Sequence, residues 1–196
     1  MMNNQYKIEK IKRKVERYLD TERFEHTVGV MYTASALAMC HRVDLDKSLV
    51  AGLLHDCAKA IPSEKKIKLC EKYDIPISHS ERENPGLLHA KLGAYLAKKK
   101  YDIEDEEILD AITYHTTGRP GMSPLEKIIY IADYIEPNRN AAPNLPTARA
   151  LAFQDLNECL YLILKDSLEY LKTKNDPIDP MTEKTYLYYK KRLNKS

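Results

Sequence analysis

The stretch Val50-Ala-Gly-Leu-Leu-His-Asp-Cys-Ala-Lys59 decides how the chain is interpreted, because it sets His55 beside Asp56 inside an apolar run. Charge in such a run costs free energy unless it is paired or bound to a metal. Adjacent residues on a helix point about 100° apart, so both reach one object only if it lies against the helix and further helices hold it. A metal ion shared among helices fits that description. The alternative is a core histidine hydrogen-bonded to its neighbouring carboxylate, and the dipeptide alone does not decide between them.

Length and composition indicate a globular protein of one domain, expected to span residues 1–196 with a core at about 15–174. Hydrophobic residues make up 43% and charged residues 31%, so the chain is neither disordered nor membrane-embedded in composition. The formal charge of +2 comes from evenly mixed signs, which argues against a broad face for nucleic acid. The longest apolar runs are too short to cross a bilayer, and the N-terminus lacks the apolar segment of a signal peptide.

The four cysteines are far apart and include no Cys-x-x-Cys pair, so buried free thiols in a reducing cytoplasm are expected. The sequence leaves the oligomeric state open, a homodimer included.

Nearly every segment has the period of a helix and none alternates like a strand, which predicts an all-α bundle of roughly eight to ten helices. Strong start signals are Asn84-Pro85, with a proline at the first helical position, and the capping box Ser123-Pro-Leu-Glu126. Residues 74–84 are polar and predict a loop. Helices are expected at about 8–19, 21–41, 46–59, 63–73, 85–100, 104–117, 124–136, 147 or 155–174 and 180 onward.

Four histidines and two aspartates stand next to apolar residues on five expected helices: His26, His55, His89, His115, Asp56 and Asp133. Any one alone is more often a satisfied core residue, but the set together indicates a metal centre. Imidazole and carboxylate suit iron, manganese, zinc or nickel, and the residues do not choose among them. His41 at a helix end and His79 in a polar segment are expected to be structural or solvated.

Spacing excludes several rival sites. No Glu-x-x-His occurs, which argues against a ferritin-like di-iron bundle and against His-Glu-x-x-His peptidases. There is no Walker-type glycine loop, no dinucleotide fingerprint and no Gly-x-Ser-x-Gly elbow.

The order His26, His55-Asp56, Asp133 resembles the HD-domain metal-dependent phosphohydrolases. Four longer motifs are similar to one subfamily, the bacterial HD-domain symmetrical bis(5'-nucleosyl)-tetraphosphatases, which split diadenosine tetraphosphate into two ADP. The resemblance covers about residues 15–174. One departure is Ala141-Ala142, where an aromatic residue that would contact a nucleoside is expected. The motifs are Arg-Phe-Glu-His at 23–26, Leu-Leu-His-Asp-Cys-Ala-Lys at 53–59, His-Thr-Thr-Gly-Arg-Pro at 115–120 and Ala-Asp-Tyr-Ile-Glu-Pro-Asn-Arg at 132–139.

The resemblance implies that an iron ion is held by His26, His55, Asp56 and Asp133. It also implies that a second group of residues contacts the phosphates of the substrate. A further variant within the superfamily places a second metal on His89 and His115, bridged by Asp56. The phosphate-facing residues would be Arg23, His89, His115, Thr116 and Arg139, and the substrate also touches the metal-bound His26, His55 and Asp133.

Positive charges near these positions agree with a polyphosphate substrate, since the fork of arginine matches phosphate oxygens. Lys59 follows His55 by four residues on the same helical face and, with His55, Asp56 and His89, is assigned to the catalytic group. Arg119 and Lys59 have a plain alternative as solvated charges. For Arg139, which directly follows the last motif helix, the functional interpretation is favoured.

Three other functions stay open at this stage. The first is an HD phosphohydrolase that acts on another nucleotide, such as a deoxynucleotide or a cyclic nucleotide. The second is an HD-type di-iron oxygenase. The third is a nucleotide-binding HD module without turnover, whose usual sign is the loss of metal ligands, and none is lost here.

Overall fold

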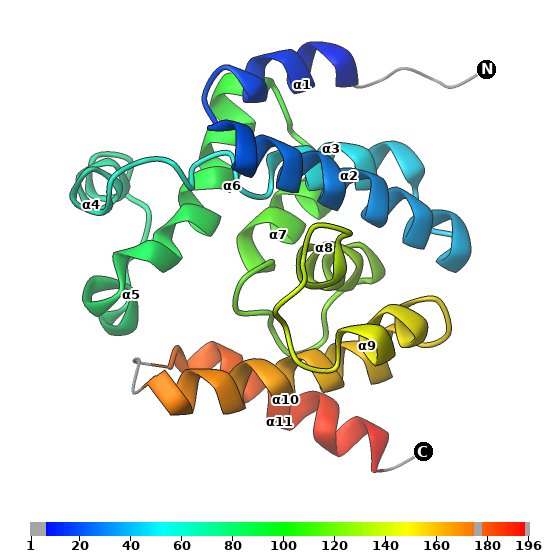
Figure 1. Cartoon of the computed structure of the whole chain (residues 1–196). Coiled ribbons are helices and arrows are strands. Elements are labelled where there is room, and N and C mark those ends of the chain that lie inside the picture. Colours follow the sequence, from blue (N-terminus) through cyan, green and yellow to red (C-terminus); the bar gives the residue numbers. More distant parts are fainter. Residues whose placement is uncertain (1–6, 175–177, 195–196) are drawn as a thin grey trace.

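The computed structural model describes residues 7–174 and 178–194, and in that part of the chain it contains eleven α-helices, one 3-10 helix and no β-strand (Figure 1). The all-α prediction is confirmed, with a helix count slightly above the expected range. Residues 1–6, where no signal peptide is expected, lie outside the described residues. The helices are α1 Ile8–Glu16, α2 Thr21–His41, α3 Leu45–Leu54, α4 Ser63–Lys72, α5 His79–Glu83, η1 Pro85–Leu87, α6 Leu88–Tyr101, α7 Glu106–Tyr114, α8 Pro124–Ile135, α9 Leu145–Ala152, α10 Leu156–Lys174 and α11 Pro180–Leu193.

Side-chain caps explain where most of these helices begin. Asp20, Asp44 and Ser123 each accept a hydrogen bond from a backbone N–H in the first turn of α2, α3 and α8. The predicted capping box is present in α8, where the Glu126 side chain also accepts a bond from the backbone of Ser123.

The prediction of a loop at 74–84 is wrong in part. Ser78 and Glu81 form a second capping box that opens the short helix α5. The spacing Ser78-x-x-Glu81 carries the signal, but the segment lacks the apolar stripe that usually accompanies it.

Two further boundaries differ from the sequence-based expectation. The stretch expected to be one helix from 46 to 59 ends at Leu54, so α3 stops before the His55-Asp56 pair. The two alternative starts at 147 and 155 are both used, because the chain breaks between α9 and α10. Asp155 accepts hydrogen bonds from the N–H groups of Asn157 and Glu158 and so opens α10.

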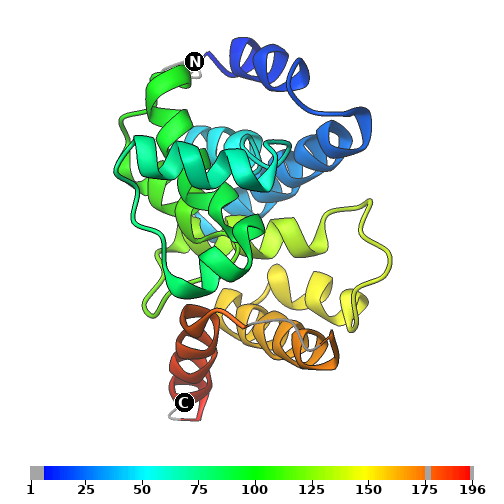
Figure 2. The ribbon, with the colours of Figure 1, turned by 90° about the vertical axis from the view of Figure 1, so that its left-hand side faces the viewer.

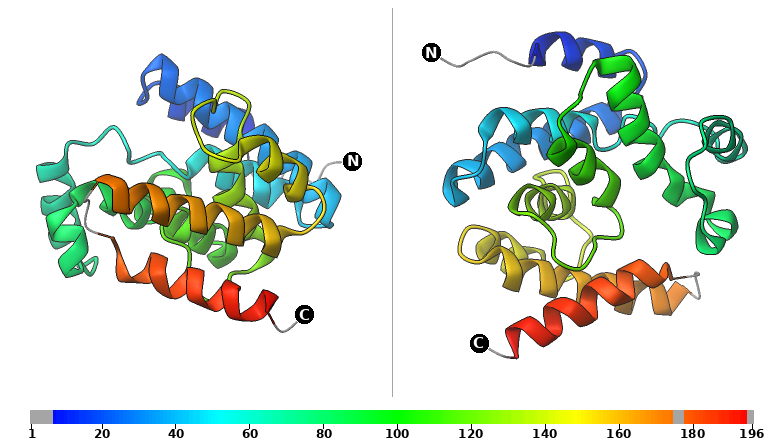
Figure 3. Two further views of the ribbon diagram at one scale, coloured as in Figure 1. Left: turned by 60° about the horizontal axis from the view of Figure 1, so that its bottom comes forward. Right: turned by 180° about the vertical axis from the view of Figure 1, so that it is seen from behind.

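The helices stack around α8. Helices α2 and α3 pack together on one side of α8, α7 lies beside it, and α10 covers it from the other side together with α9 and α11 (Figures 1 and 3). Helices α4, α5 and α6 form a flank, which Figure 2 brings to the front. The main apolar core draws on α1, α2, α3, α7, α8 and α10, and a smaller cluster lies under α4 and α6. The N-terminal ends of α2 and α6 and the C-terminal ends of α3, α7 and α8 therefore come together, and polar side chains lie between them.

Candidate metal centre

The six polar residues that the sequence singles out come from five different segments and meet at one place. His26 lies in the second turn of α2, and Asp133 lies in the last turn of α8. His89 is in the first turn of α6, and His115 follows α7 directly. All are buried except His26 and Asp133, which are half-buried.

His55 and Asp56 bring their side chains to one centre although they are neighbours in the chain. His55 is the C-cap residue of α3, which ends at Leu54, and Asp56 lies in the turn that follows. The His55 Nε2 and Asp56 Oδ2 atoms are 3.8 Å apart.

Three of the histidines are oriented in the same way. The Nδ1 of His55 lies 2.8 Å from the carbonyl oxygen of Gly52, three residues earlier in the chain. His89 makes the same contact with Gly86 at 2.6 Å, and His115 makes it with Ile112 at 2.7 Å. A carbonyl accepts only from an N–H, so Nδ1 carries the proton and Nε2 is left with a free lone pair that points inward. This is the arrangement that a metal-binding imidazole requires.

His26 is held by a carboxylate instead. Its Nδ1 lies 3.1 Å from Glu136 Oε1, and Glu136 is almost completely buried. Glu136 also accepts a hydrogen bond from the backbone N–H of Asn138, 2.8 Å away. A buried carboxylate behind a histidine fixes the ring and raises its basicity as a ligand.

Several inward-facing atoms have no hydrogen-bond partner although they are buried: His26 Nε2, His55 Nε2 and Asp56 Oδ1. His26 Nε2 lies 3.1 Å from Asp133 Oδ1, but the two atoms lack hydrogen-bond geometry. Buried polar atoms without partners are costly. Lone pairs of nitrogen and oxygen that converge in this way fit a divalent cation, which would satisfy all of them at once.

Three overlapping groups could each hold an ion, since the ligand atoms within each group lie within 4.8 Å of one another. One contains His26, His55 and Asp56, and a second contains His55, His115 and Asp133. The third contains Asp56, His89 and His115. Asp56 belongs to the first and third groups, so the geometry accommodates one ion or a pair that shares this carboxylate.

Protonation states favour a cation as well. Burial lowers the pKa of His55 to about 4, so its imidazole is neutral near neutral pH. Burial acts to raise the pKa of Asp56, but the neighbouring imidazoles of His55, His115 and His89 and the ammonium group of Lys59 outweigh it and hold this pKa well below its usual range. The Cys57 thiol is different, since burial raises its pKa to about 12. The centre thus offers a neutral His55 imidazole and a charged Asp56 carboxylate, while the adjacent thiol stays protonated.

Cationic and hydroxyl groups surround the ligand atoms. Lys59 Nζ lies 3.3 Å from His89 Nε2 and 3.7 Å from Asp56 Oδ1. Thr116 Oγ1 lies 3.2 Å from His115 Nε2 and 3.3 Å from His89 Nε2. Arg139 donates to the Asp133 carboxylate at 2.9 Å. These residues therefore lie where the sequence places them, at the edge of the metal centre.

Two arginines are held by carboxylates at the surface or beside the centre. Arg23 donates to Asp20, one turn earlier on α2, at 3.0 Å. Arg119 binds Asp110 and the buried Glu126, at 2.8 Å and 2.7 Å. Arg119 thus has a buried ion-pair partner on α8, in place of the solvated setting given as its plain alternative.

Two hollows flank the centre and meet at Glu22, Asn138 and Arg139. The first, the aromatic hollow, has a volume of about 440 Å³, and the second, the charged hollow, about 530 Å³. Ile163 and Ser167 of the aromatic hollow carry no sequence signal, because they lie on α10, far from any motif. The aromatic hollow is lined in part by Tyr130, Tyr134, Ala141, Ala142, Ile163 and Ser167, and the charged hollow by Asp20, Arg23, Glu25, His26, Asp56, Lys59 and Glu136.

The helical fold and the His, His-Asp, Asp centre define a class of protein. The family model of the HD domain matches residues 23–138, and the chain belongs to this family. HD-domain hydrolases depend on metal, in agreement with the ligand groups described above.

Individual proteins are similar to this chain over most of its length. The chain is 46% identical to the symmetrical bis(5'-nucleosyl)-tetraphosphatase of Bacillus subtilis, over 88% of this chain and 91% of the relative. It is 43% identical to the protein of the same name from Halalkalibacterium halodurans, with the same coverage. A solved structure from Clostridium acetobutylicum, described as a predicted HD superfamily hydrolase involved in NAD metabolism, superposes with a TM-score of 0.91. That protein is 40% identical, and the match covers 95% of this chain and 98% of the other.

Proposed function

We propose that this protein is a metal-dependent hydrolase that splits diadenosine tetraphosphate symmetrically into two ADP. The observation that carries the proposal is the convergence of His26, His55, Asp56 and Asp133, where the buried Nε2 atoms of His26 and His55 have no hydrogen-bond partner. Relatives of nearly the same length bear the name symmetrical bis(5'-nucleosyl)-tetraphosphatase. In this proposal the region that matches the HD family and the helices on either side of it form a single domain.

Iron is the proposed metal at these four residues, and manganese, nickel or zinc would meet the same nitrogen and oxygen ligands. When bound, such a metal polarises a phosphoryl oxygen and lowers the pKa of a water at the reacting phosphorus. His89 and His115, with Asp56 between them, form the proposed second metal position.

The chain's own cations hold the phosphates. Arg139 lies on the rim shared by both hollows, so its guanidinium reaches phosphate oxygens once the Asp133 carboxylate turns to a metal. Arg23 and Lys59 line the charged hollow and meet the phosphates of the leaving half. His89, which lies 3.3 Å from Lys59, stabilises the charge that develops on the leaving oxygen. Thr116 and His115 contact the phosphates of the half that stays bound. Phosphoryl transfer depends on such positioning and charge.

The two hollows suit the two halves of the substrate. The aromatic hollow has tyrosine rings and the Ser167 hydroxyl beside the metal centre, which fits a nucleoside. The charged hollow, with Arg23 and Lys59 on its wall, fits the phosphates of the second half. The middle phosphoanhydride bond then lies over the centre, and its cleavage gives equal products.

The test is hydrolysis of diadenosine tetraphosphate in ¹⁸O-water, followed by chromatography and mass spectrometry of the products. ADP alone is expected, with one heavy oxygen on a terminal phosphate of half of the ADP molecules. AMP together with ATP would place the reacting phosphorus elsewhere and contradict the proposed position of the two halves.

A panel of deoxynucleotides and cyclic nucleotides, run beside the dinucleotide, distinguishes the other HD phosphohydrolases. Turnover without dioxygen excludes the oxygenase, and any metal-dependent turnover excludes a binding module without catalysis. The partner in this proposal is a small dinucleoside polyphosphate, not a nucleic acid. The proposed compartment is the cytoplasm, in keeping with four free cysteines. In the described part of the chain, no helix has the length and hydrophobicity that a membrane crossing requires.

A further inference from the structure

Two adjoining hollows lie between α1, α4 and α6, and none of the metal-centre histidines or aspartates lines them. The tyrosine hollow has a volume of about 390 Å³ and contains the side chains of Tyr18, Tyr73 and Tyr101. The lysine hollow has a volume of about 290 Å³. The two hollows share Lys100 and Tyr101, so they adjoin at these two residues.

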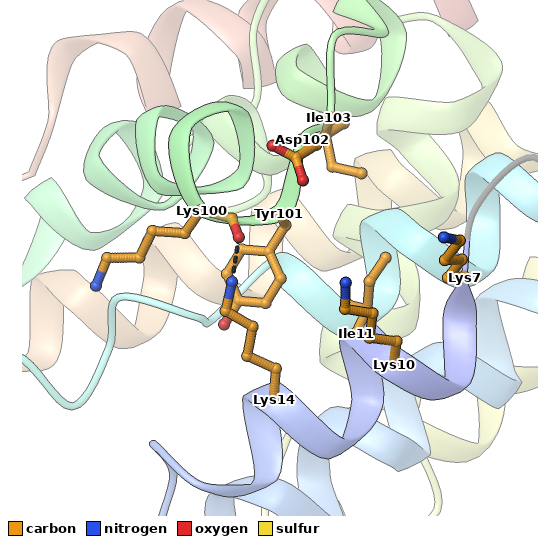
Figure 4. A pocket seen from close by; sticks show the side chains of 8 residues that line it. All are labelled: Lys7, Lys10, Ile11, Lys14, Lys100, Tyr101, Asp102 and Ile103. Atoms are coloured by element: carbon orange, nitrogen blue, oxygen red, sulfur yellow. Dashed lines mark hydrogen bonds between the residues drawn. The ribbon is translucent and has the colours of Figure 1, made fainter.

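The lysine hollow is strongly cationic. Lys7, Lys10 and Lys14 of the N-terminal segment line it, while Figure 4 shows the Lys100 side chain of α6 extending away from these three. The Lys14 amino group donates to the backbone carbonyl of Lys100 and lies 4.6 Å from the centre of the Tyr101 ring. Among its described lining residues, Asp102 alone has a carboxylate side chain. Three ammonium groups against one carboxylate attract a ligand with several negative charges.

The tyrosine hollow offers flat surfaces. Tyr73 stacks on Tyr95 with ring centres 4.3 Å apart and an angle of 19°, so its ring is held in place. Lys100 Nζ lies 5.4 Å from the centre of the Tyr18 ring. No aspartate or glutamate is found among its described lining residues, which include Lys65. Fixed aromatic rings next to ammonium groups are the combination that takes up a nucleobase together with its phosphates.

We propose that these hollows form a second nucleotide-binding site, which takes a nucleoside polyphosphate with its base against Tyr18 and Tyr73 and its phosphates beside Lys10 and Lys14. The volume of the tyrosine hollow falls within the range of small-ligand pockets, about 300–1,000 Å³. Its wall includes Cys57, the residue directly after Asp56. The bound nucleotide therefore contacts the back of the turn that holds His55 and Asp56.

The test measures ATP binding to the full-length protein by isothermal titration calorimetry. Two ATP molecules per chain are expected, one at the metal centre and one at the second site. The double substitution Lys14→Glu with Tyr18→Ala should weaken one of the two sites about tenfold or more, because it removes a stacking surface and reverses a charge. The other site and the metal content should stay unchanged.

A matched control is available on the opposite face of α1. Lys12 lies 6.0 Å from the centre of the Tyr32 ring, and Tyr32 is 59% exposed against 56% for Tyr18. Lys12→Glu with Tyr32→Ala makes the same change of net charge and exposes a similar surface, and it should leave both sites intact. An equal loss of ATP affinity in the two double variants would mean that the effect comes from long-range charge, and it would overturn the proposal.

Two other ligands complete the experiment. Inorganic tripolyphosphate should bind the second site more weakly than ATP. Equal affinity would mean that the nucleobase makes no contribution to binding there, and this would contradict its proposed contact with Tyr18 and Tyr73. A ten-nucleotide RNA that displaces ATP from this site with higher affinity would replace the nucleotide by a nucleic acid. Binding of ATP by the Lys14→Glu, Tyr18→Ala variant with the stoichiometry and affinities of the unmodified protein would refute the site outright. Since no readout depends on hydrolysis, the result is independent of the proposed reaction.

Discussion

Glu136 is the residue whose part in the centre is easiest to isolate, because it touches one ligand only from behind. It is buried, and its carboxylate holds His26 Nδ1 at 3.1 Å. In Glu136→Gln the side chain keeps its size but loses the charge that fixes the histidine. We expect the metal affinity to fall by about 10–100-fold, measured by competition with a chelator of known affinity.

The control for this substitution is Glu126→Gln. Glu126 is equally buried in α8, the helix that Glu136 follows as the C-cap residue, but it binds Arg119 and the backbone of Ser123. It should lower the melting temperature through the lost cap and ion pair, without a change in metal affinity. If both variants lose metal to the same extent, the effect of Glu136 is general destabilisation.

Arg23 and Arg139 are expected to act on the phosphates and not on the metal. Each is at least two-fifths exposed and pairs with a carboxylate at the edge of the charged hollow. Arg23→Ala and Arg139→Ala should keep the metal content and lower the turnover of diadenosine tetraphosphate by about 10²-fold or more. Arg82→Ala removes an exposed ion pair with Glu71 and serves as the control. Normal turnover in both test variants would mean that other residues hold the phosphates.

Most residues of the candidate metal centre can be predicted from the sequence. The polar residues isolated among apolar neighbours, together with the motif resemblance, single out His26, His55, Asp56, His89, His115 and Asp133, which the structure brings together. Glu136 lies within the last motif, but the sequence alone indicates no role for it, because glutamate is seldom buried. Ser167 and Ile163 of the aromatic hollow have no local signal, since only the packing of α10 on α8 brings them there.

Among the helices, the crossing of α2 and α3 places the His55-Asp56 turn. At Gly52 an added Cβ atom would lie 2.8 Å from the Met31 Cα of α2, which is too close for a real contact. The carbonyl of Gly52 also accepts the hydrogen bond from His55 Nδ1. Gly52→Ala should therefore lower the free energy of unfolding by about 1–3 kcal/mol through overpacking, which exceeds its gain in helix propensity. Urea denaturation measures the change.

Gly93 on α6 provides the comparison. A Cβ atom there would meet Ile112 Cγ2 at 3.4 Å, an ordinary contact, so Gly93→Ala should be neutral or stabilising by up to about 1 kcal/mol. Equal losses in the two variants would show that the α2–α3 crossing is not the cause.

Helix boundaries mark the limit of what the sequence predicts for the elements. Apolar periodicity continues through His55 and gives no sign that α3 ends at Leu54. The turn is held by the local hydrogen bond of His55 to Gly52 and by a long-range one from the Cys57 thiol to the carbonyl of Gly93. The second contact depends on the packing of α6, which the local sequence does not reveal.

For the molecule as a whole, metal binding and folding are linked. The proposed ligands come from α2, the turn after α3, α6, the end of α7 and α8, which meet only in the folded chain. Bound metal therefore stabilises the native state, by about 2.7 kcal/mol at a free concentration a hundredfold above the dissociation constant. Removal of metal with a chelator should lower the melting temperature, and re-addition should restore it.

His55→Ala and Asp56→Ala should abolish this metal-dependent shift, along with the metal content measured by elemental analysis. His79 supplies the control, because its side chain is 88% exposed and lies away from the centre on α5. His79→Ala should keep both the metal and the shift. A metal-dependent shift that persists in His55→Ala and Asp56→Ala would mean that the stabilising ion binds elsewhere on the chain. The assignment of these five segments to one metal centre would then be wrong.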